Sequence, residues 1–485
     1  MPVYARHLRA NQFGVLSLLA VTLTLVTLVL KFGLNHAFFR HYYEAQEEEH
    51  RRKIVGSTLI FLVGSSVILT ALLCLAAPEV SRLIFAGEPG RADLLQLVFL
   101  TAFFEVITLV PDSILRAKFK SATYSVLNII AFAFQIALIS YLVLAVDPSV
   151  ENVLLGRLGG TAFEALLFFF AVRHDLSLKF SLTELRAMLG FGAPLIFGQL
   201  AFILFVMIDR FFLQRYSSDR ELGFYAMGTT LVSVVTELVT VPFSQVWTVM
   251  RFSVMHEEGA EMYYSRVLTY ISLVSMFLAL GVAAVSGDGL LLFGTKGYWP
   301  AANILPLLAL SAVLDSASRV LNVGITLKKR TIFAPIVIVA ALAVNVILNF
   351  LLIPRYGSLG ATVSTLLSFA VFCVLRYWAS NMFFKVHYEW GRVFTIGIVG
   401  SLLMALFYLN DYLRGDLNRY SLDDPVRKRM LYLSILIKVC LTISFPAVLF
   451  ALRFYSDNER MRVAAAWRRV SSELRRSRLN EAVGD

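Results

Sequence analysis

The chain has 485 residues, of which 58% are hydrophobic and only 16% are charged. Soluble domains contain fewer apolar and more charged residues, so this composition excludes an ordinary soluble protein. The formal net charge of +11 could indicate a polyanionic partner such as a nucleic acid. The distribution of the charge along the chain, described below, argues against it.

The apolar residues form blocks of about 20, the length of a helix that crosses a hydrocarbon core of about 30 Å. About 13 such blocks follow one another along the chain. They centre near residues 25, 66, 104, 134, 162, 198, 235, 275, 313, 343, 369, 401 and 441. The connecting loops are too short to fold as catalytic domains. The sequence therefore predicts an all-α polytopic membrane protein that is not an enzyme.

Basic residues gather on alternate loops. When the tail from Arg453 onward is placed in the cytoplasm, the loops on that side carry clearly more Lys and Arg than the loops on the other side. This is the positive-inside pattern, so the positive charge reflects topology and lipid contact, and no nucleic-acid partner is expected. The first span follows Arg6 and Arg9 without a small-residue cleavage site, which indicates a retained span rather than a signal peptide.

The three cysteines lie inside predicted spans, and the seven histidines show no metal-ligand spacing. We therefore expect no disulfide framework, no metal site and no cofactor.

The chain carries an internal repeat. Aligning Arg6 with Arg215 brings Gly14 onto Gly223 and superimposes two polar stripes at helical spacing. The stripes are Thr24, Thr27, Lys31 and Asn35 in the first half, and Ser233, Thr236, Thr240 and Ser244 in the second. A further stretch pairs Thr101, Glu105, Thr108 and Asp112 with Ser311, Asp315, Ser318 and Asn322, and Gln135 with Asn345. Repeats of this kind build many transporters, with the substrate site where the halves face each other.

The predicted helix at 188–208 has no counterpart in the first half. Either that half has lost a helix or, as we favour, the native chain starts upstream of Met1, which would give about 14 spans arranged as two six-helix lobes and two extra helices. The predicted domains are an N-terminal lobe (1–180), a C-terminal lobe (181–385), two additional transmembrane helices (386–452) and a basic cytoplasmic tail (453–485). The tail is expected to form an amphipathic helix on the cytoplasmic leaflet.

Polar groups are kept in membrane helices where they face other helices or a wet cavity, because exposing them to lipid is costly. Polar stripes on single faces in both halves therefore predict a central cavity, lined by Lys31 and Asn35 from the first half and by Ser244, Arg251 and Asn345 from the second. Lys31 would either reach toward the membrane surface or serve as an inward cation, and its place beside Asn35 favours the second role.

Three acidic residues are candidates for gating or ion coupling: Glu105, Asp209 and Asp315. Asp209 and Arg210 stand side by side at the end of a span, where they would form a local salt bridge or part of a gate, with Arg210 able to hold a phosphate by two hydrogen bonds. Glu105 and Asp315 occupy equivalent positions and could pair with Lys31 or Arg319, or titrate to couple ion flow. Asp315 and Arg319, four residues apart, could also pair on one helix face.

Five segments together resemble the polysaccharide-export (Wzx-type) flippases of the multidrug/oligosaccharidyl-lipid/polysaccharide exporter superfamily. They are GLNHAFFRHYYEAQEEEHRRK, IDRFFLQRYSSDRELGFYA, PFSQVW, LKKRT and NFLLIPRYGSLGATVSTLLS, between residues 3 and 380. The resemblance implies two lobes of helices around a cationic cavity. It also implies alternating access that moves an undecaprenyl-pyrophosphate-linked oligosaccharide across the bacterial cytoplasmic (inner) membrane for surface polysaccharide biosynthesis. It places cavity cations at Lys31, Arg210, Arg251 and Arg319. The sequence departs from the family pattern at its start, where a first helix is expected.

The expected partners are the lipid-linked oligosaccharide and the bilayer, with polysaccharide polymerase and glycosyltransferases as candidate protein partners. The alternative function is a cation-coupled drug or small-molecule antiporter of the same superfamily, with Glu105 and Asp315 as ion sites, but the basic, hydroxyl-rich stripes argue against it. A membrane glycosyltransferase or polymerase is a third hypothesis, and its catalytic domain has no room in the longest loop, 410–429.

Overall fold

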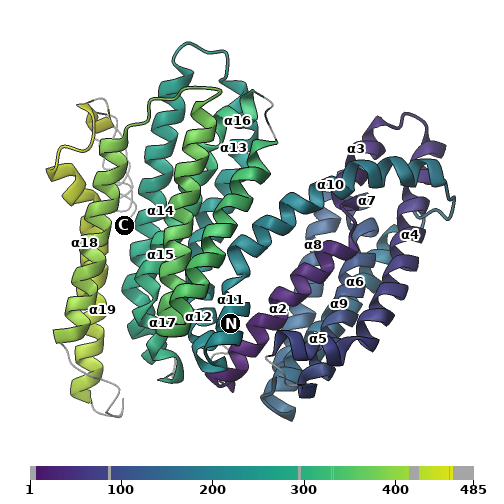
Figure 1. Cartoon of the computed structure of the whole chain (residues 1–485), viewed down its shortest axis with the longest axis horizontal. Helices are drawn as coiled ribbons and strands as arrows, with labels where there is room; N and C mark the ends of the chain where they lie inside the picture. Colours follow the sequence, from purple (N-terminus) through teal and green to yellow (C-terminus); the bar gives the residue numbers. More distant parts are fainter. Residues whose placement is uncertain are drawn as a thin grey trace, which may run out of the picture.

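The computed structural model describes residues 7–85, 89–292, 296–328, 330, 332–413, 425–457 and 459–461. The described residues are almost entirely helical. Figure 1 shows two groups of helices that meet at one end, near the start of α2 and at α11 and α12, and separate toward the other, near α3 and α13. We call these the closed end and the open end.

The N-terminal lobe is formed by the first helices of the chain. Its helices are α2 (Ala10–Leu30), α3 (Leu34–Glu44), α4 (Glu48–Leu75), α5 (Ala77–Ile84), η1 (Pro89–Arg91), α6 (Ala92–Ile107), α7 (Leu109–Ala117), α8 (Ser121–Tyr141), η2 (Leu142–Val146) and α9 (Val150–Val172). Ser149 starts α9 by accepting a hydrogen bond from the backbone N–H of Asn152, which satisfies one of the free donors of the first turn.

The remaining helices form the C-terminal lobe, followed by two further helices, α18 and α19, at the end of the chain. They are α10 (Leu182–Met207), α11 (Asp209–Tyr216), α12 (Asp219–Val235), η3 (Thr236–Thr240), α13 (Val241–Ser253), α14 (Ala260–Leu292), η4 (Lys296–Asn303), α15 (Leu305–Leu321), α16 (Val323–Leu327), α17 (Phe333–Asn381), α18 (Trp390–Leu413) and α19 (Pro425–Ala451). Ser181 and Ser218 cap α10 and α12 in the same way as Ser149 caps α9.

Within the described residues, 12 helical segments are long and apolar enough to cross a membrane. One of them, α17, has 49 residues and joins two helices across a kink at Gly357, where φ is 54° and ψ is −129°. Its two parts match the sequence blocks centred near residues 343 and 369. The prediction of an all-α, polytopic membrane fold is confirmed.

Two spans are interrupted at positions that the internal repeat makes equivalent. The first span breaks between α2 and α3, where Phe32 and Gly33 have φ values of 49° and 70°. In the span formed by α12 and α13, the α-helical hydrogen bonding is replaced at η3 by a π-helical turn. This turn ends at Thr240, the residue aligned with Lys31. Broken helices free backbone groups inside the membrane, so they are kept where they line a cavity or a binding site.

Helix α10 runs between the two lobes (Figure 1). Its first half packs on the N-terminal lobe, where Gly192 lies backbone to backbone against Gly33 and Thr58 contacts the sulfur of Met188. Its last turns pack on α17, where the ring of Phe205 lies 4.9 Å from that of Phe369. Pro194 lies inside the helix between these two contact regions, where it cannot donate a backbone hydrogen bond.

The last two helices are joined to the C-terminal lobe by a buried ionic cluster. Lys438 of α19 is 1% exposed and lies 2.9 Å from Asp288 of α14 and 2.7 Å from Asp411 of α18. Beyond α19, burial alone would raise the pKa of Glu459, but hydrogen bonds from Tyr270, Ser456 and Arg392 lower it to about 2. Most of the predicted amphipathic tail, residues 462–485, lies outside the described residues.

Candidate functional site

A cavity of about 800 Å³ lies among the helices of the N-terminal lobe and opens toward the C-terminal lobe. Its walls come from α2, α3, α6, α7, α8 and α9, with Met207, Arg210 and Thr230 on the facing side. Seven charged residues line it: Lys31, Glu105, Asp112, Arg116, Arg157, Glu164 and Arg210. Hydroxyl and amide groups share the lining, contributed by Ser17, Thr24, Asn35, Thr101, Thr108, Gln135, Thr161 and Thr230.

Lys31 stands at the break between α2 and α3 and lines the cavity together with Thr24 and Asn35 of the same polar stripe. Its ammonium group forms no hydrogen bond and no ion pair with the residues that the structure describes. Glu105, Asp112 and Glu164 attract its charge from nearby, while Arg116 repels it. Its position leaves an ammonium group available to an anion that enters the cavity.

Arg210 lines the cavity and connects the two halves of the molecule through its hydrogen bonds. Its Nε donates to the Ser17 hydroxyl of α2 at 2.9 Å, and its guanidinium also donates to the Thr229 hydroxyl of α12 at 3.1 Å. Arg210 and Asp209 do not pair with each other, so the local salt bridge considered from the sequence is not formed. The two side chains leave the start of α11 in different directions.

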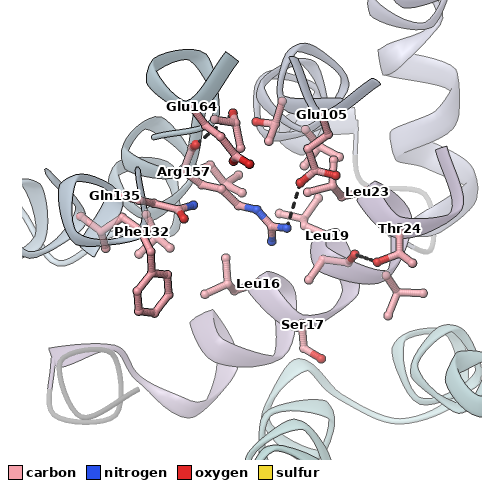
Figure 2. A pocket seen from close by; sticks show the side chains of 18 of the residues that line it. Leu16, Ser17, Leu19, Leu23, Thr24, Glu105, Phe132, Gln135, Arg157 and Glu164 are labelled. Atoms are coloured by element: carbon pink, nitrogen blue, oxygen red, sulfur yellow. Dashed lines mark hydrogen bonds and ion pairs between the residues drawn. The ribbon is translucent and has the colours of Figure 1, made fainter. Parts of the chain in front are cut away.

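Glu105 and Arg157 form an ion pair across the cavity wall (Figure 2). The guanidinium of Arg157 on α9 donates to Glu105 on α6 at 3.2 Å, and Thr27 of α2 donates to the other carboxylate oxygen at 3.1 Å. The sequence offered Lys31 and Arg319 as partners of Glu105, and the structure gives it Arg157 instead. Arg157 was not among the predicted site residues, although an arginine inside a predicted span is itself a signal of a polar site.

Asp209 lies in a second polar centre, inside the C-terminal lobe, and is completely buried. Its carboxylate accepts hydrogen bonds from Tyr225 at 2.6 Å, from Thr365 at 2.7 Å and from Asn349 at 2.5 Å. Asn349 also donates to Asn345, and both side chains are completely buried. All three donors to the carboxylate are neutral, and among the described residues Asp209 forms no ion pair.

This centre has unused polar atoms. The Oδ1 of Asn349 and the Nδ2 of Asn345 are buried without a hydrogen-bond partner. Buried unpaired atoms are uncommon in proteins and often mark a place where an ion or water belongs. Asn349 and Thr365 were missed in the sequence, although Asn345 was noted, because only the packing of α17 against α11 brings them to Asp209.

The remaining predicted residues lie away from the cavity. Asp315 and Arg319 form the same-helix ion pair that their spacing allowed, at 3.1 Å. Arg319 also lies 5.4 Å from the ring of Phe202 on α10. The guanidinium carbon of Arg251 lies 5.1 Å from the centre of the Phe252 ring, close to the end of α13. Ser244 is half-buried on the same helix. In the polar stripe of the second half, Thr240 faces α15, where its hydroxyl lies 2.6 Å from that of Ser316.

No group of three or more His, Cys, Asp or Glu side chains suited to a metal ion occurs within the described ranges. The cavity lining holds four basic and three acidic side chains beside its hydroxyl and amide groups. The basic, hydroxyl and amide groups suit an anionic, hydroxyl-rich ligand.

Comparisons with known proteins agree with this arrangement. The structure is similar to that of the lipid II flippase MurJ in an inward closed conformation, with a TM-score of 0.72 and 15% identity, over 93% of this chain and 96% of the other. It is also similar to an inward-facing multidrug resistance MATE transporter of the MOP superfamily, with a TM-score of 0.62 and 15% identity, over 82% and 93% of the two chains. The chain is a multi-pass membrane protein that shares its fold with these two structures.

The sequence comparisons define the group more closely. A family profile described as polysaccharide biosynthesis protein matches residues 3–298, and the chain belongs to this family. A protein of the Lsg locus of Haemophilus influenzae is 23% identical over 246 residues, which are 49% of this chain and 57% of that relative. The chain thus spans little more than half the length of this curated relative.

Proposed function

We propose that this protein is a flippase that moves a polyprenyl-pyrophosphate-linked oligosaccharide across the bacterial cytoplasmic membrane for surface polysaccharide biosynthesis. The observation that carries the proposal is the cavity of about 800 Å³ among spanning helices, with Lys31, Arg157 and Arg210 in its lining. Cations in a low-dielectric cavity bind pyrophosphate strongly, and the hydroxyl and amide groups beside them suit the sugar. The lipid tail would remain in the bilayer.

The proposed orientation places the open end in the cytoplasm. The loops at that end carry a concentration of basic residues, among them Lys118, Lys120, Arg173 and Lys179. A hydrogen bond to Asp175 raises the pKa of Lys118, so Lys118 stays charged at neutral pH. Under the positive-inside rule the basic end is cytoplasmic. The head group would then enter from the cytoplasm and leave when the closed end opens.

Asp209 is proposed to couple transport to an ion. The coupling ion is proposed to be a proton or a small cation, because Asp209 is fully buried among the neutral donors Tyr225, Asn349 and Thr365, and the unpaired Oδ1 of Asn349 offers a further oxygen ligand. Glu105 and Asp315 each have an arginine partner, so the neutral surroundings of Asp209 favour it for this role. Coupling at Asp209 also keeps the antiporter alternative open to test.

The flippase proposal is tested by complementation. A strain that lacks its own flippase receives the wild-type protein or a variant, and exported polysaccharide is measured at the cell surface. We expect Lys31→Ala to abolish export while the protein inserts normally, and Lys31→Arg to retain part of the activity because the charge is kept. Arg210→Gln should also reduce export. Arg186→Ala is the control, because Arg186 is an exposed basic residue outside the cavity.

Wild-type export from both Lys31→Ala and Arg210→Gln would show that the cavity does not carry a pyrophosphate. The same strains report on the antiporter alternative when they are grown with cationic drugs. If the protein increased drug resistance but restored no polysaccharide, the flippase proposal would be wrong and the antiporter alternative would be supported. The proposed polymerase and glycosyltransferase partners are tested by crosslinking in the complemented strain.

A further inference from the structure

The ion pair between Glu105 and Arg157 differs from the other ion pair in the cavity lining. Asp112 and Arg116 belong to the same helix, whereas Glu105 and Arg157 join α6 to α9. Both partners of the Glu105–Arg157 pair remain accessible, with 25% and 36% of their side chains exposed. Figure 2 shows the guanidinium of Arg157 projecting into the cavity toward Glu105. The pair is therefore in the path of a ligand rather than behind the wall.

The geometry of the pair is weaker than an arginine–carboxylate pair can be. Only one guanidinium nitrogen of Arg157 donates to Glu105, at 3.2 Å, whereas charge-assisted bonds reach about 2.7–2.9 Å and often come in parallel pairs. A pyrophosphate carries more negative charge than a carboxylate and can accept from both edges of the guanidinium. A substrate that enters the cavity can therefore compete successfully with Glu105 for Arg157.

The second carboxylate oxygen of Glu105 links this competition to α2. It accepts the hydrogen bond from Thr27, which lies one helical turn before Lys31 on the same polar stripe. When Glu105 leaves Arg157, its bond to Thr27 is also free to rearrange. α2 is also the helix that meets α12 at the closed end, so the Thr27–Glu105 bond connects the ion pair to the helix that closes this end.

We propose that Glu105 is an internal counter-ion that occupies the place of the substrate pyrophosphate in the empty cavity, an inference that rests on the proposed function. The arriving pyrophosphate displaces Glu105 and binds Arg157. When the substrate leaves, Glu105 returns to Arg157 and prevents the product from binding again. Glu105 therefore lowers the affinity for the substrate and promotes its release, and Arg157 is the cation that alternates between two anions.

The test is a binding measurement on the full chain in nanodiscs, with farnesyl pyrophosphate as the probe. Glu105→Gln should bind it more tightly, by about fivefold, because a competing pair of this kind contributes roughly 1 kcal/mol. Arg157→Gln should bind it more weakly, and adding Glu105→Gln to Arg157→Gln should give no further gain. Export in the complemented strain should fall for Glu105→Gln, since release becomes slower.

Glu164→Gln is the matched control. Glu164 also lines the cavity, and it has no ion-pair partner among the residues that the structure describes, so this change removes one negative charge without releasing an arginine. Its effect on affinity should be clearly smaller than that of Glu105→Gln. Glu105→Asp is a second variant, which keeps the charge but shortens the reach to Arg157, and it should also bind more tightly than the wild type.

The outcomes separate the two proposals. If the wild type binds the probe and Glu105→Gln binds it no more tightly than Glu164→Gln, the displacement of Glu105 is wrong while the flippase proposal stands. If neither the wild type nor any variant binds farnesyl pyrophosphate, the pyrophosphate cavity itself is wrong and the inference falls with it.

Discussion

Gly14 of α2 and Gly223 of α12 lie against each other at the closed end, where the backbones of the two helices meet without a side chain between them. A Cβ on Gly14 would overlap the backbone oxygen of Asp219, and one on Gly223 would overlap that of Ala10. The internal repeat aligns these two glycines, so the contact joins equivalent points of the two halves. Around it, Arg91 pairs with Asp219 at 2.7 Å and Tyr298 donates to the carbonyl of Leu8.

The first prediction concerns this contact. Gly223→Ala should force α2 and α12 apart and shift the protein away from the state described here, because the overlapping atoms are backbone and cannot turn aside. We expect a large loss of export. In a background without native cysteines, a cysteine replacing Ala20 in the cavity lining should react faster with an impermeant maleimide added from the periplasm.

Gly64→Ala is the control for this experiment, because no atom lies within 4 Å of a Cβ at that position. It should leave export and labelling unchanged. If Gly223→Ala behaved like Gly64→Ala in both measurements, the glycine contact would have no part in closing this end.

The second prediction concerns Asp209. Asp209→Asn keeps the size of the side chain and removes the charge that we propose to bind a proton or a cation. Export should fall by about tenfold, the size of a typical coupling between two sites, and the remainder should no longer respond to the ion gradient. The measurement is export while the proton or sodium gradient is collapsed separately. Asp147→Asn changes an exposed carboxylate at the closed end and should keep the wild-type response.

The third prediction concerns the anchoring of the last two helices. Lys438→Ala leaves the buried carboxylate of Asp288 without this cation, and removing one partner of a buried ion pair costs about 3–5 kcal/mol. We expect a clear drop in the thermal unfolding temperature of the protein in detergent. Arg429→Ala, at an exposed position on the same helix, should not change it. Equal melting of Lys438→Ala and wild type would contradict a stabilising role for the cluster.

The fourth prediction concerns the tail. Deleting residues 460–485 should leave export largely intact, because the proposed site lies in the two lobes and α19 ends at Ala451. Polysaccharide at the cell surface and the amount of inserted protein are measured together. Complete loss of export with normal insertion would give the tail a role in transport.

The sequence predicted the spans and the polar stripe of the first half because both depend on local spacing. Apolar runs define helices that cross a membrane, and the helical spacing of Thr24, Lys31 and Asn35 places them on one side of the span even though it breaks at Phe32 and Gly33. Those three residues all line the cavity. The expectation of an additional first helix stays a prediction.

The pairing of charges could not be predicted in the same way, because it depends on how distant helices pack. Glu105 and Arg157 meet only where α6 lies against α9, and the Asp209 centre needs residues of α11, α12 and α17 together. The adjacency of Asp209 and Arg210 in the sequence was misleading for a physical reason. Successive residues of a helix point about 100° apart, so the two side chains entered different centres.

Helix α10 has a consequence for how the motion can be observed. It is attached to both lobes, at Gly192 on one side and at Phe205 on the other, with Pro194 near the middle. Any rocking of the lobes must therefore change the bend of this one helix. The distance between two spin labels at positions 186 and 203 would measure this bend, so the states of the transport cycle could be followed within a single helix.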